Sequence, residues 1–368
     1  PSMASTLLSP GVVIQERDLT LGSIETVEVN VGAIAGAFTK GPVNKPVRIS
    51  SESELLSKFG EPNDSNYETW FAASSFLAYG GVLDVVRASG ASLKTANKGG
   101  VSLTINSVED YEGNYYDGTA AWDYASRNIG AVGNSIKVVV IDSGANQQVT
   151  LAGAIQSAGV QAGSLIQNSA GTKSAYIHKI TGSTVVDVIW VSGGAWTTSD
   201  LVDDGSNPDV AITAVADWYD SQMITPTLNW NQVAPQPGTS VHVAERGGSN
   251  DEMHIVVVDV DGGVTGTPNT VLEKFLYVSK ASDGKSAEGS LVYYPEVILN
   301  SSNYIYWGSH DNEDIWDVSG NALAASSNVG GNSTTAFDIL GEKEYPLTGG
   351  ADDFTLSQAE IIAGYDYF

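Results

Sequence analysis

The stretch YETWFAASSFLAYGGVLDVVRA, residues 67–88, joins a helical pattern to a strand pattern. Apolar residues recur at helical spacing as far as Leu77, and the pair Gly80-Gly81 then stops the pattern. The run VLDVVRA that follows is apolar and is typical of a buried strand. A helix that leads directly into such a strand indicates a mixed α/β unit.

The residues before this stretch extend the same unit. Residues 26–49 alternate β-branched and small residues around a Gly-Pro turn, which predicts two strands. Ser51 and Glu54 stand at capping-box spacing before a short apolar run, which predicts a helix. We therefore expect a β, α, α, β unit within the first 88 residues.

The middle of the chain has a different character. From residue 89 to about 345 it is rich in Gly, Ser, Thr, Asn and Val, with short strand-like runs. Helical spacing of apolar residues predicts helices at 209–223 and 271–281 within this region. Residues 355–368 then begin with Thr355 and Gln358 at capping-box spacing, which predicts a terminal helix.

This change of character and its reversal predict a discontinuous domain. We expect an α+β multidomain fold, in which a small α/β domain built from both chain ends, residues 24–88 and 346–368, carries a large inserted region. That region, residues 89–345, is acidic and should be mostly β, with two subdomains that meet near 190–205. Residues 1–23 should form an N-terminal arm.

The arm contains one strand-like run, VVIQE, directly after a Ser-Pro-Gly turn. A lone strand must find a sheet with which to pair. The residues of this run are Val12, Val13, Ile14, Gln15 and Glu16.

The composition restricts the partners and the chemistry. The chain has 17 Lys+Arg against 43 Asp+Glu, a formal net charge of −26, and no Lys/Arg cluster. Its field therefore repels phosphate, and we expect no nucleic-acid partner. The absence of Cys and the scatter of the four His residues leave no set of ligands for a transition metal, so we expect no metal site and no cofactor.

No segment has the length of a membrane span or the pattern of a secretory signal. Apolar stretches such as 31–38 and 185–191 are much shorter than the ~18 apolar residues that a spanning helix needs. The N-terminus has neither a basic nor an apolar signal region, so we expect synthesis in the cytoplasm.

Four local patterns could carry chemistry, and each favours a structural interpretation. Residues 284–286, Gly-Lys-Ser, lack the opening Gly of a P-loop. Residues 259–263 resemble part of a calcium loop but lack its later ligands, which favours a turn. The acidic run 310–314 favours a solvated loop over a cation or paired-carboxylate site, and His254 is expected to be a satisfied strand residue. We expect no catalytic residue and no enzymatic activity.

Several segments together resemble a known family, the contractile tail sheath proteins of T4-like bacteriophages. The order and spacing of TLLSPGVVIQERD and the α/β unit match the N-terminal region of that family, and later islands match its strand-to-helix passages. The segments that carry the resemblance are 6–18, 33–62, 76–88, 125–140, 250–281 and 341–368.

The resemblance implies a structural subunit of a contractile tail sheath. Such a subunit polymerises around the tail tube and contracts to drive the tube through the host envelope, so that the genome is ejected into the host cytoplasm. The implied partners are further copies of the chain, in a helical sheath of sixfold rings at full length, the tail tube protein, and the baseplate and tail terminator proteins. The implied location is the virion tail, after synthesis in the host cytoplasm.

The resemblance also implies how subunits are linked. Residues 12–16 would add a strand to the sheet of a neighbouring subunit, because main-chain hydrogen bonds of this kind survive a large rotation. Sheath proteins of this type continue into a conserved C-terminal domain, so we expect this chain to be an N-terminal fragment that is monomeric by itself.

Three alternatives stay open at the level of sequence. The first is the sheath of a tailocin or of a secretion-type contractile injection system. The second is a carbohydrate-active enzyme that works with paired carboxylates. The third is a calcium-stabilised adhesin.

Overall fold

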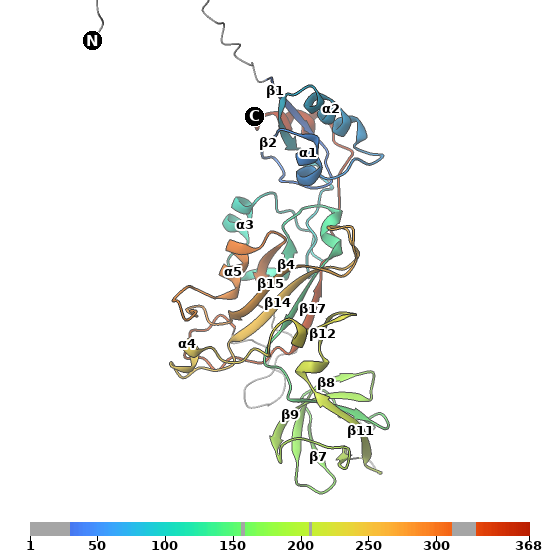
Figure 1. The fold of residues 1–368 in the computed structure, drawn as a ribbon, viewed down its shortest axis with the longest axis vertical. Helices are drawn as coiled ribbons and strands as arrows, with labels where there is room; N and C mark the ends of the chain where they lie inside the picture. Colours follow the sequence, from blue (N-terminus) through green and yellow to red (C-terminus); the bar gives the residue numbers. More distant parts are fainter. Residues whose placement is uncertain (1–29, 156–158, 206–207, 311–328) are drawn as a thin grey trace, which may run out of the picture.

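The computed structural model describes residues 30–155, 159–205, 208–310 and 329–368. The chain is elongated, with three parts arranged one after another (Figure 1). We call residues 30–88 and 356–368 the head, residues 147–217 the barrel, and the described residues between them the body. Helices and strands are mixed, as expected for an α+β fold.

The head is a three-stranded sheet between helices. Strand β3 lies in the centre, parallel to β1 and antiparallel to β2. The elements are β1 (Val31–Gly36), β2 (Val47–Ile49), α1 (Glu52–Phe59), α2 (Tyr67–Ala78), β3 (Val82–Arg87) and, from the chain end, α6 (Gln358–Tyr365). The helix and strand predicted from residues 67–88 are thus confirmed.

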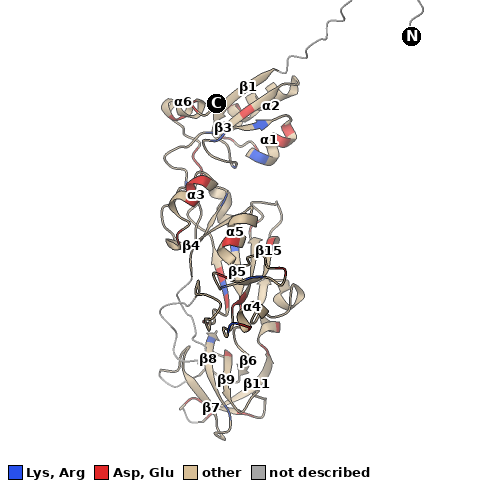
Figure 2. Cartoon of the chain, turned by 90° about the vertical axis from the view of Figure 1, so that its left-hand side faces the viewer, with Lys and Arg blue, Asp and Glu red and all other residues tan. Residues whose placement is uncertain are grey.

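The small residues of β1 let helices approach both faces of the head sheet. An ideal Cβ on Gly32 would lie 2.7 Å from the Phe76 ring of α2, whereas the Cβ of Ala35 lies 2.9 Å from the ideal Cβ of Gly364 on α6. Positions 32 and 35 point to opposite faces because side chains alternate along a strand. Figure 2 shows α2 and α6 on the two sides of this sheet.

Local capping explains where the head helices begin. Ser51 Oγ accepts a hydrogen bond from the Glu54 backbone N–H at 3.2 Å, as the spacing predicted. The predicted cap of the last helix is wrong by two residues, because Thr355 Oγ1 donates to Asp353 instead, at 3.1 Å. Helix α6 is capped by Ser357, which forms a capping box with a Glu three residues later.

The body is built on a four-stranded antiparallel sheet of order β15-β14-β5-β17. Val138 and Val140 of β5 belong to a core on one face, while Val139 and Ile141 belong to a core on the other face, so this strand is buried on both sides. The strands are β5 (Ile136–Ile141), β14 (Glu252–Asp259), β15 (Thr270–Ser279) and β17 (Glu342–Pro346).

Smaller elements cover this sheet. A two-stranded ladder of β4 and β16 and the helix α5 contribute to the core on one face, and the segment after the barrel contributes to the core on the other. Their bounds are α3 (Val108–Asn114), β4 (Thr119–Ser126), the 3-10 turns Ala131–Ser135, Tyr219–Ser221 and Trp230–Gln232, β12 (Met223–Thr225), β13 (Leu228–Asn229), α4 (Val241–Ala244), α5 (Tyr294–Ser301) and β16 (Ile305–Ser309).

The third part is a closed six-stranded barrel of order β10-β11-β6-β9-β8-β7. Its interior is filled by apolar residues such as Val149, Ile177 and Val188. The strands are β6 (Gln147–Leu151), β7 (Leu165–Asn168), β8 (Ser174–Thr181), β9 (Val185–Ser192), β10 (Leu201–Asp203) and β11 (Val210–Asp217). The border expected near 190–205 falls inside the barrel, between β9 and β10.

Two of the predicted helices are wrong. Most of residues 209–223 forms strand β11, whose Val210 and Ile212 point into the barrel, and residues 271–281 form most of strand β15 and the turn after it. Strand pairing with β6 and with β14 supplies these segments with hydrogen bonds and burial, which outweighs their helical spacing.

Candidate functional site

The candidate linking residues 12–16 lie outside the described residues. The described chain begins at Asn30, whose carbonyl accepts a hydrogen bond from Val82 N–H at 2.9 Å, and it continues directly into β1. Within the part of the chain that the structure describes, β1 pairs with β3 alone, and Val31 is 54% exposed. The outer side of β1 is therefore an edge at which another strand can pair.

His254 is a satisfied strand residue, as predicted. Its Nε2 lies 2.9 Å from the Pro235 carbonyl oxygen, and its Nδ1 accepts the Tyr277 backbone N–H at 3.0 Å. Burial lowers the pKa of His254, so the ring stays neutral near pH 7. Both ring nitrogens are engaged, which leaves neither for proton transfer.

The acidic run is described only at its first residue. His310 Nε2 lies 3.1 Å from the Tyr293 hydroxyl, and its Nδ1 contacts the Tyr294 hydroxyl. Burial lowers the pKa of His310 to about 4. Residues 311–314, on which the cation or paired-carboxylate interpretation depends, lie outside the described residues.

The calcium-like sequence forms the turn between β14 and β15. Asp259 Oδ2 accepts the Val264 N–H at 3.1 Å and the Thr265 N–H at 2.7 Å, and its Oδ1 accepts from the Ser135 hydroxyl. Burial by itself would raise the pKa of Asp259, but these hydrogen bonds outweigh burial and lower it. The carboxylate closes a turn, which confirms the structural interpretation.

The P-loop-like residues lie in a tight turn. Ser286 N–H donates to the Ser290 carbonyl at 2.9 Å, and Lys285 forms an isolated bridge with Leu291. The next helix, α5, begins only at Tyr294. A phosphate-binding loop requires a helix that starts at the loop, so this segment lacks the necessary context.

A buried ion pair that the sequence did not reveal lies inside the body. Lys280 Nζ is 2.7 Å from Asp142 Oδ2, and both side chains are 0% exposed. Asp142 also accepts the backbone N–H groups of Leu340 and Gly341 at 2.7 and 2.8 Å, and Lys280 donates to the Asp338 carbonyl at 2.8 Å. Both charged groups form hydrogen bonds out of contact with solvent. The pair therefore joins the ends of strands β5 and β15.

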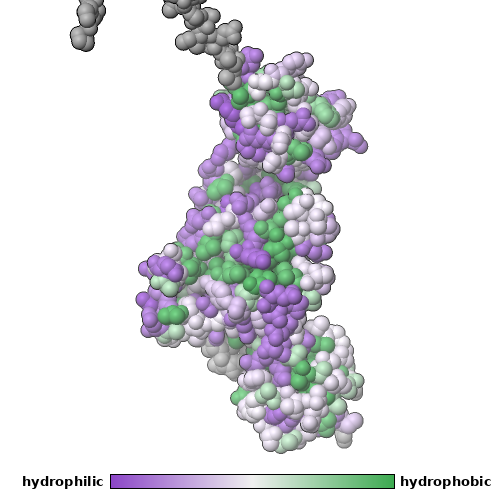
Figure 3. Space-filling model, viewed as in Figure 1, coloured by the Kyte–Doolittle hydropathy of each residue, from purple (hydrophilic) through white to green (hydrophobic). Residues whose placement is uncertain are grey.

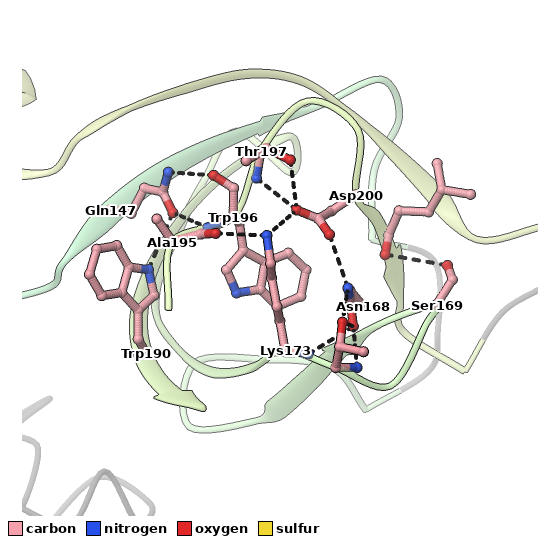
Figure 4. A network of polar contacts seen from close by, with 11 residues as sticks. Gln147, Asn168, Ser169, Lys173, Trp190, Ala195, Trp196, Thr197 and Asp200 are labelled. Atoms are coloured by element: carbon pink, nitrogen blue, oxygen red, sulfur yellow. Dashed lines mark hydrogen bonds and ion pairs between the residues drawn. The ribbon is translucent and has the colours of Figure 1, made fainter. Parts of the chain in front are cut away.

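A polar network joins the loops at one end of the barrel (Figure 4). Lys173 Nζ donates to Asp200 Oδ2 and to the Ala195 carbonyl, each at 2.7 Å. Asp200 also accepts from Thr197 N–H at 2.8 Å and from Asn168 Nδ2 at 2.9 Å. Burial alone would raise the pKa of Asp200, but these donors outweigh it and hold the pKa well below its usual range. These contacts connect the loops to one another.

The described residues form neither a metal-binding cluster nor a membrane-spanning helix. Among residues 30–155, 159–205, 208–310 and 329–368, no three His, Asp or Glu side chains are grouped to hold a metal ion. No helix within those same ranges is long and apolar enough to cross a membrane. The features that the described residues do contain are an edge of β1 at which a strand can pair, and internal polar contacts such as the pair of Lys280 and Asp142.

The comparisons with known proteins point in one direction. No protein-family profile matches the chain. The tail sheath protein of Salmonella phage ViI is 28% identical over 332 residues, which cover 81% of this chain and 49% of that protein. The tail sheath protein of Vibrio phage KVP40 is 26% identical over 81% of this chain and 50% of its own length.

A third relative matches a shorter segment. The tail sheath protein of Enterobacteria phage T4 is 34% identical over 83 residues, 23% of this chain and 12% of that protein. A solved sheath tail protein from Listeria innocua covers 52% of this chain at 16% identity, with a TM-score of 0.18, and one from Desulfitobacterium hafniense covers 56% at 14% identity, with a TM-score of 0.19. TM-scores this low do not support a conclusion about the fold.

These matches fix the relationship and its extent. The chain spans about half the length of the curated relatives from phages ViI and KVP40. Over 81% of its own length, the chain is similar in sequence to the tail sheath proteins of these two phages.

Proposed function

We propose that this chain forms part of a structural subunit of a contractile phage tail sheath. The observation that carries the proposal is the match of 81% of the chain to two proteins named tail sheath protein. In this role the subunit polymerises with further copies around the tail tube. Contraction then drives the tube through the host envelope, and the genome is ejected into the host cytoplasm.

The role requires binding surfaces rather than chemistry. The subunit contacts its own copies, the tube protein, and the baseplate and terminator proteins, and it resides in the virion tail after synthesis in the host cytoplasm. The engaged ring nitrogens of His254 and the buried pair of Lys280 and Asp142 support a non-enzymatic role, since both sites are occupied by internal contacts. The curated relatives named above are phage proteins, which favours a phage tail over a tailocin or a secretion system.

The domain organisation is part of the proposal. The α/β domain comprises residues 24–88 and 346–368, with residues 89–345 inserted; the packing of α6 against β1 and β3 supports this, although residues 346–355 lie in the body, where Pro346 pairs with Lys137. The closed barrel, residues 147–217, is the distal unit of that insertion.

On the face seen in Figure 3, apolar side chains gather over the body more than over the head.

The linking arm supplies the contact between subunits. Residues 12–16 add a strand to the sheet of a neighbouring copy, through main-chain hydrogen bonds that tolerate rotation of one subunit against the next. The outer edge of β1 supports pairing of this kind at the head, since among the described residues β1 pairs with β3 alone.

Assembly of an extended chain tests the proposal. We would join this chain to the half of the ViI tail sheath protein that it does not match, and compare this extended chain with variants that lack residues 1–23 or carry Ile14→Pro, which removes a main-chain donor. Negative-stain microscopy and light scattering should show tubes or stacked rings for the extended chain and none for the two arm variants. Glu16→Gln is the matched control and should assemble. A monodisperse extended chain would contradict the sheath role, and assembly by the variants would contradict the arm.

A further inference from the structure

The junction between the head and the body is small. Its apolar part is a cluster of three residues, Val43 from the head and Leu93 and Ile129 from the body, each 2% exposed. The main core of the head is a separate cluster around Phe59 and Trp70. Two parts joined by so little apolar surface are expected to move relative to each other unless another contact fixes them.

Arg87 supplies a contact of this kind at the last position of β3. Its Nη1 donates to the Ile129 carbonyl of the body at 2.7 Å and to the Gly41 carbonyl of the head at 3.4 Å. Its Nη2 lies 3.4 Å from Asp352 Oδ1, which also accepts the Ala131 N–H at 3.2 Å. The side chain of Arg87 is 2% exposed, so one buried guanidinium connects the head, the body and the segment that returns to α6.

The chain around this contact is shaped to allow it. Gly130 has φ 120°, and a Cβ there would lie 2.2 Å from Asp352 Oδ1, so only glycine permits the carboxylate to approach. The two segments that connect the head with the body are also paired with each other, through isolated bridges from Lys94 to Ala351 and from Asn97 to Thr348.

A cleft lies beside the junction and leaves room for movement. Its volume is about 710 Å³, and it is lined by Ser53, Leu56 and Ser57 of α1 on the head side and by the β14–β15 turn at residues 262–266 on the body side. Asp352 also lines it. Figure 1 shows this turn reaching from the body towards the head. Rotation of the head about the two connecting segments would close or widen this cleft.

We propose that Arg87 is a latch that fixes the angle between the head and the body, and that its loss lets the head rotate across the cleft. A second ion pair also spans the junction, between Lys45 Nζ and Glu109 Oε1 at 3.3 Å, but its side chains are 56% and 70% exposed. Exposed pairs contribute little, because water and salt screen them. Lys45 therefore provides a matched control. The latch concerns this chain alone and does not depend on the sheath role.

The experiment uses the absence of native Cys, which gives site-specific spin labels without background. Labels at Ser57→Cys and Asp261→Cys report the width of the cleft, and labels at Ser57→Cys and Glu68→Cys report the head alone; all three positions are exposed. Double electron–electron resonance would measure the distance between the two spin labels in the parent and in the variants Arg87→Gln and Lys45→Gln.

We expect one narrow cleft distance in the parent and in Lys45→Gln, and a distribution at least twice as broad in Arg87→Gln, with the head distance narrow throughout. A cleft distance in Arg87→Gln as narrow as in the parent would overturn the proposal. If Arg87→Gln also broadens the head distance, the head itself has loosened. The same cleft distance measured in Asp352→Asn then tests the proposal. That variant keeps the acceptor for Ala131 and removes the charge opposite Arg87, so a broad cleft distance supports the latch and a narrow one overturns it.

Discussion

Glu342 is a buried carboxyl whose charge opposes folding. Lys179 Nζ of the barrel lies 3.7 Å from its Oε2, and the Glu342 side chain is 11% exposed. Burial raises the pKa of Glu342 from 4.5 to about 7, although Lys179 acts in the opposite direction. The folded pKa exceeds the unfolded one, so the stability that protonated Glu342 contributes is complete below about pH 4.5 and is lost as the pH rises through about 7.

Glu342→Gln should remove this dependence on pH, because an amide resembles the protonated acid. We expect the free energy of unfolding of the variant to exceed that of the parent at pH 8, by at most about 3 kcal/mol, and to approach it at pH 5. Denaturant titrations of both proteins at several pH values measure the difference. Parallel pH profiles would contradict the assignment.

The pair of Lys280 and Asp142 should respond strongly to loss of one partner. Lys280→Met leaves the Asp142 carboxylate buried without its counter-ion, which costs about 3–5 kcal/mol. Lys58→Met removes an exposed partner of Glu54 and should cost far less, because water screens this pair, so it is the matched control. Thermal unfolding of the two variants checks this difference, and equal losses would show that burial of the pair has no such effect.

Elements with strong local signals could be predicted from the sequence, and elements that depend on distant partners could not. The cap of α1 and the passage from α2 to β3 are encoded within a few residues. Strands β11 and β15 carry helical spacing, yet pairing with β6 and β14 decides their structure. The same limit applies to sites: the role of His254 follows from its local strand, whereas Lys280 and Asp142 are 138 residues apart and meet only in the folded body.

Helix α6 docks on the head sheet through one small residue. The ideal Cβ of Gly364 lies 2.9 Å from the Cβ of Ala35 and 3.3 Å from that of Ala88. Gly364→Leu has no room at this contact and should destabilise the head by about 1–3 kcal/mol. Ala363→Leu lies on the exposed side of the helix and should change little. Hydrogen exchange of the β1 amides measures the effect, and equal protection in both variants would contradict the packing.

On the scale of the whole molecule, the barrel is a closed unit whose two ends meet. Gln147 at the start of β6 pairs directly with Asp217 at the end of β11, so the chain enters and leaves the barrel at neighbouring positions. Opposite residues in an antiparallel pair lie only about 5 Å apart, a distance that two glycines span easily. The barrel core and the body cores are separate clusters, and the partly buried Ile189 of β9 packs against one body core from outside the barrel core.

Replacement of residues 147–217 by Gly-Gly should therefore leave the body and the head folded. The body would lose the contact of Lys179 with Glu342 and that of Trp218 Nε1 with Asp187 Oδ2 at 3.2 Å, so we expect a lower melting temperature but a cooperative transition. Hydrogen exchange should still protect the β5 and β14 amides. The intact chain with Gly-Gly inserted before Gln147 is the control for the changed connection. Loss of protection in the deletion variant alone would mean that the barrel is required for the body to fold, which the closed strand order and the separate cores argue against.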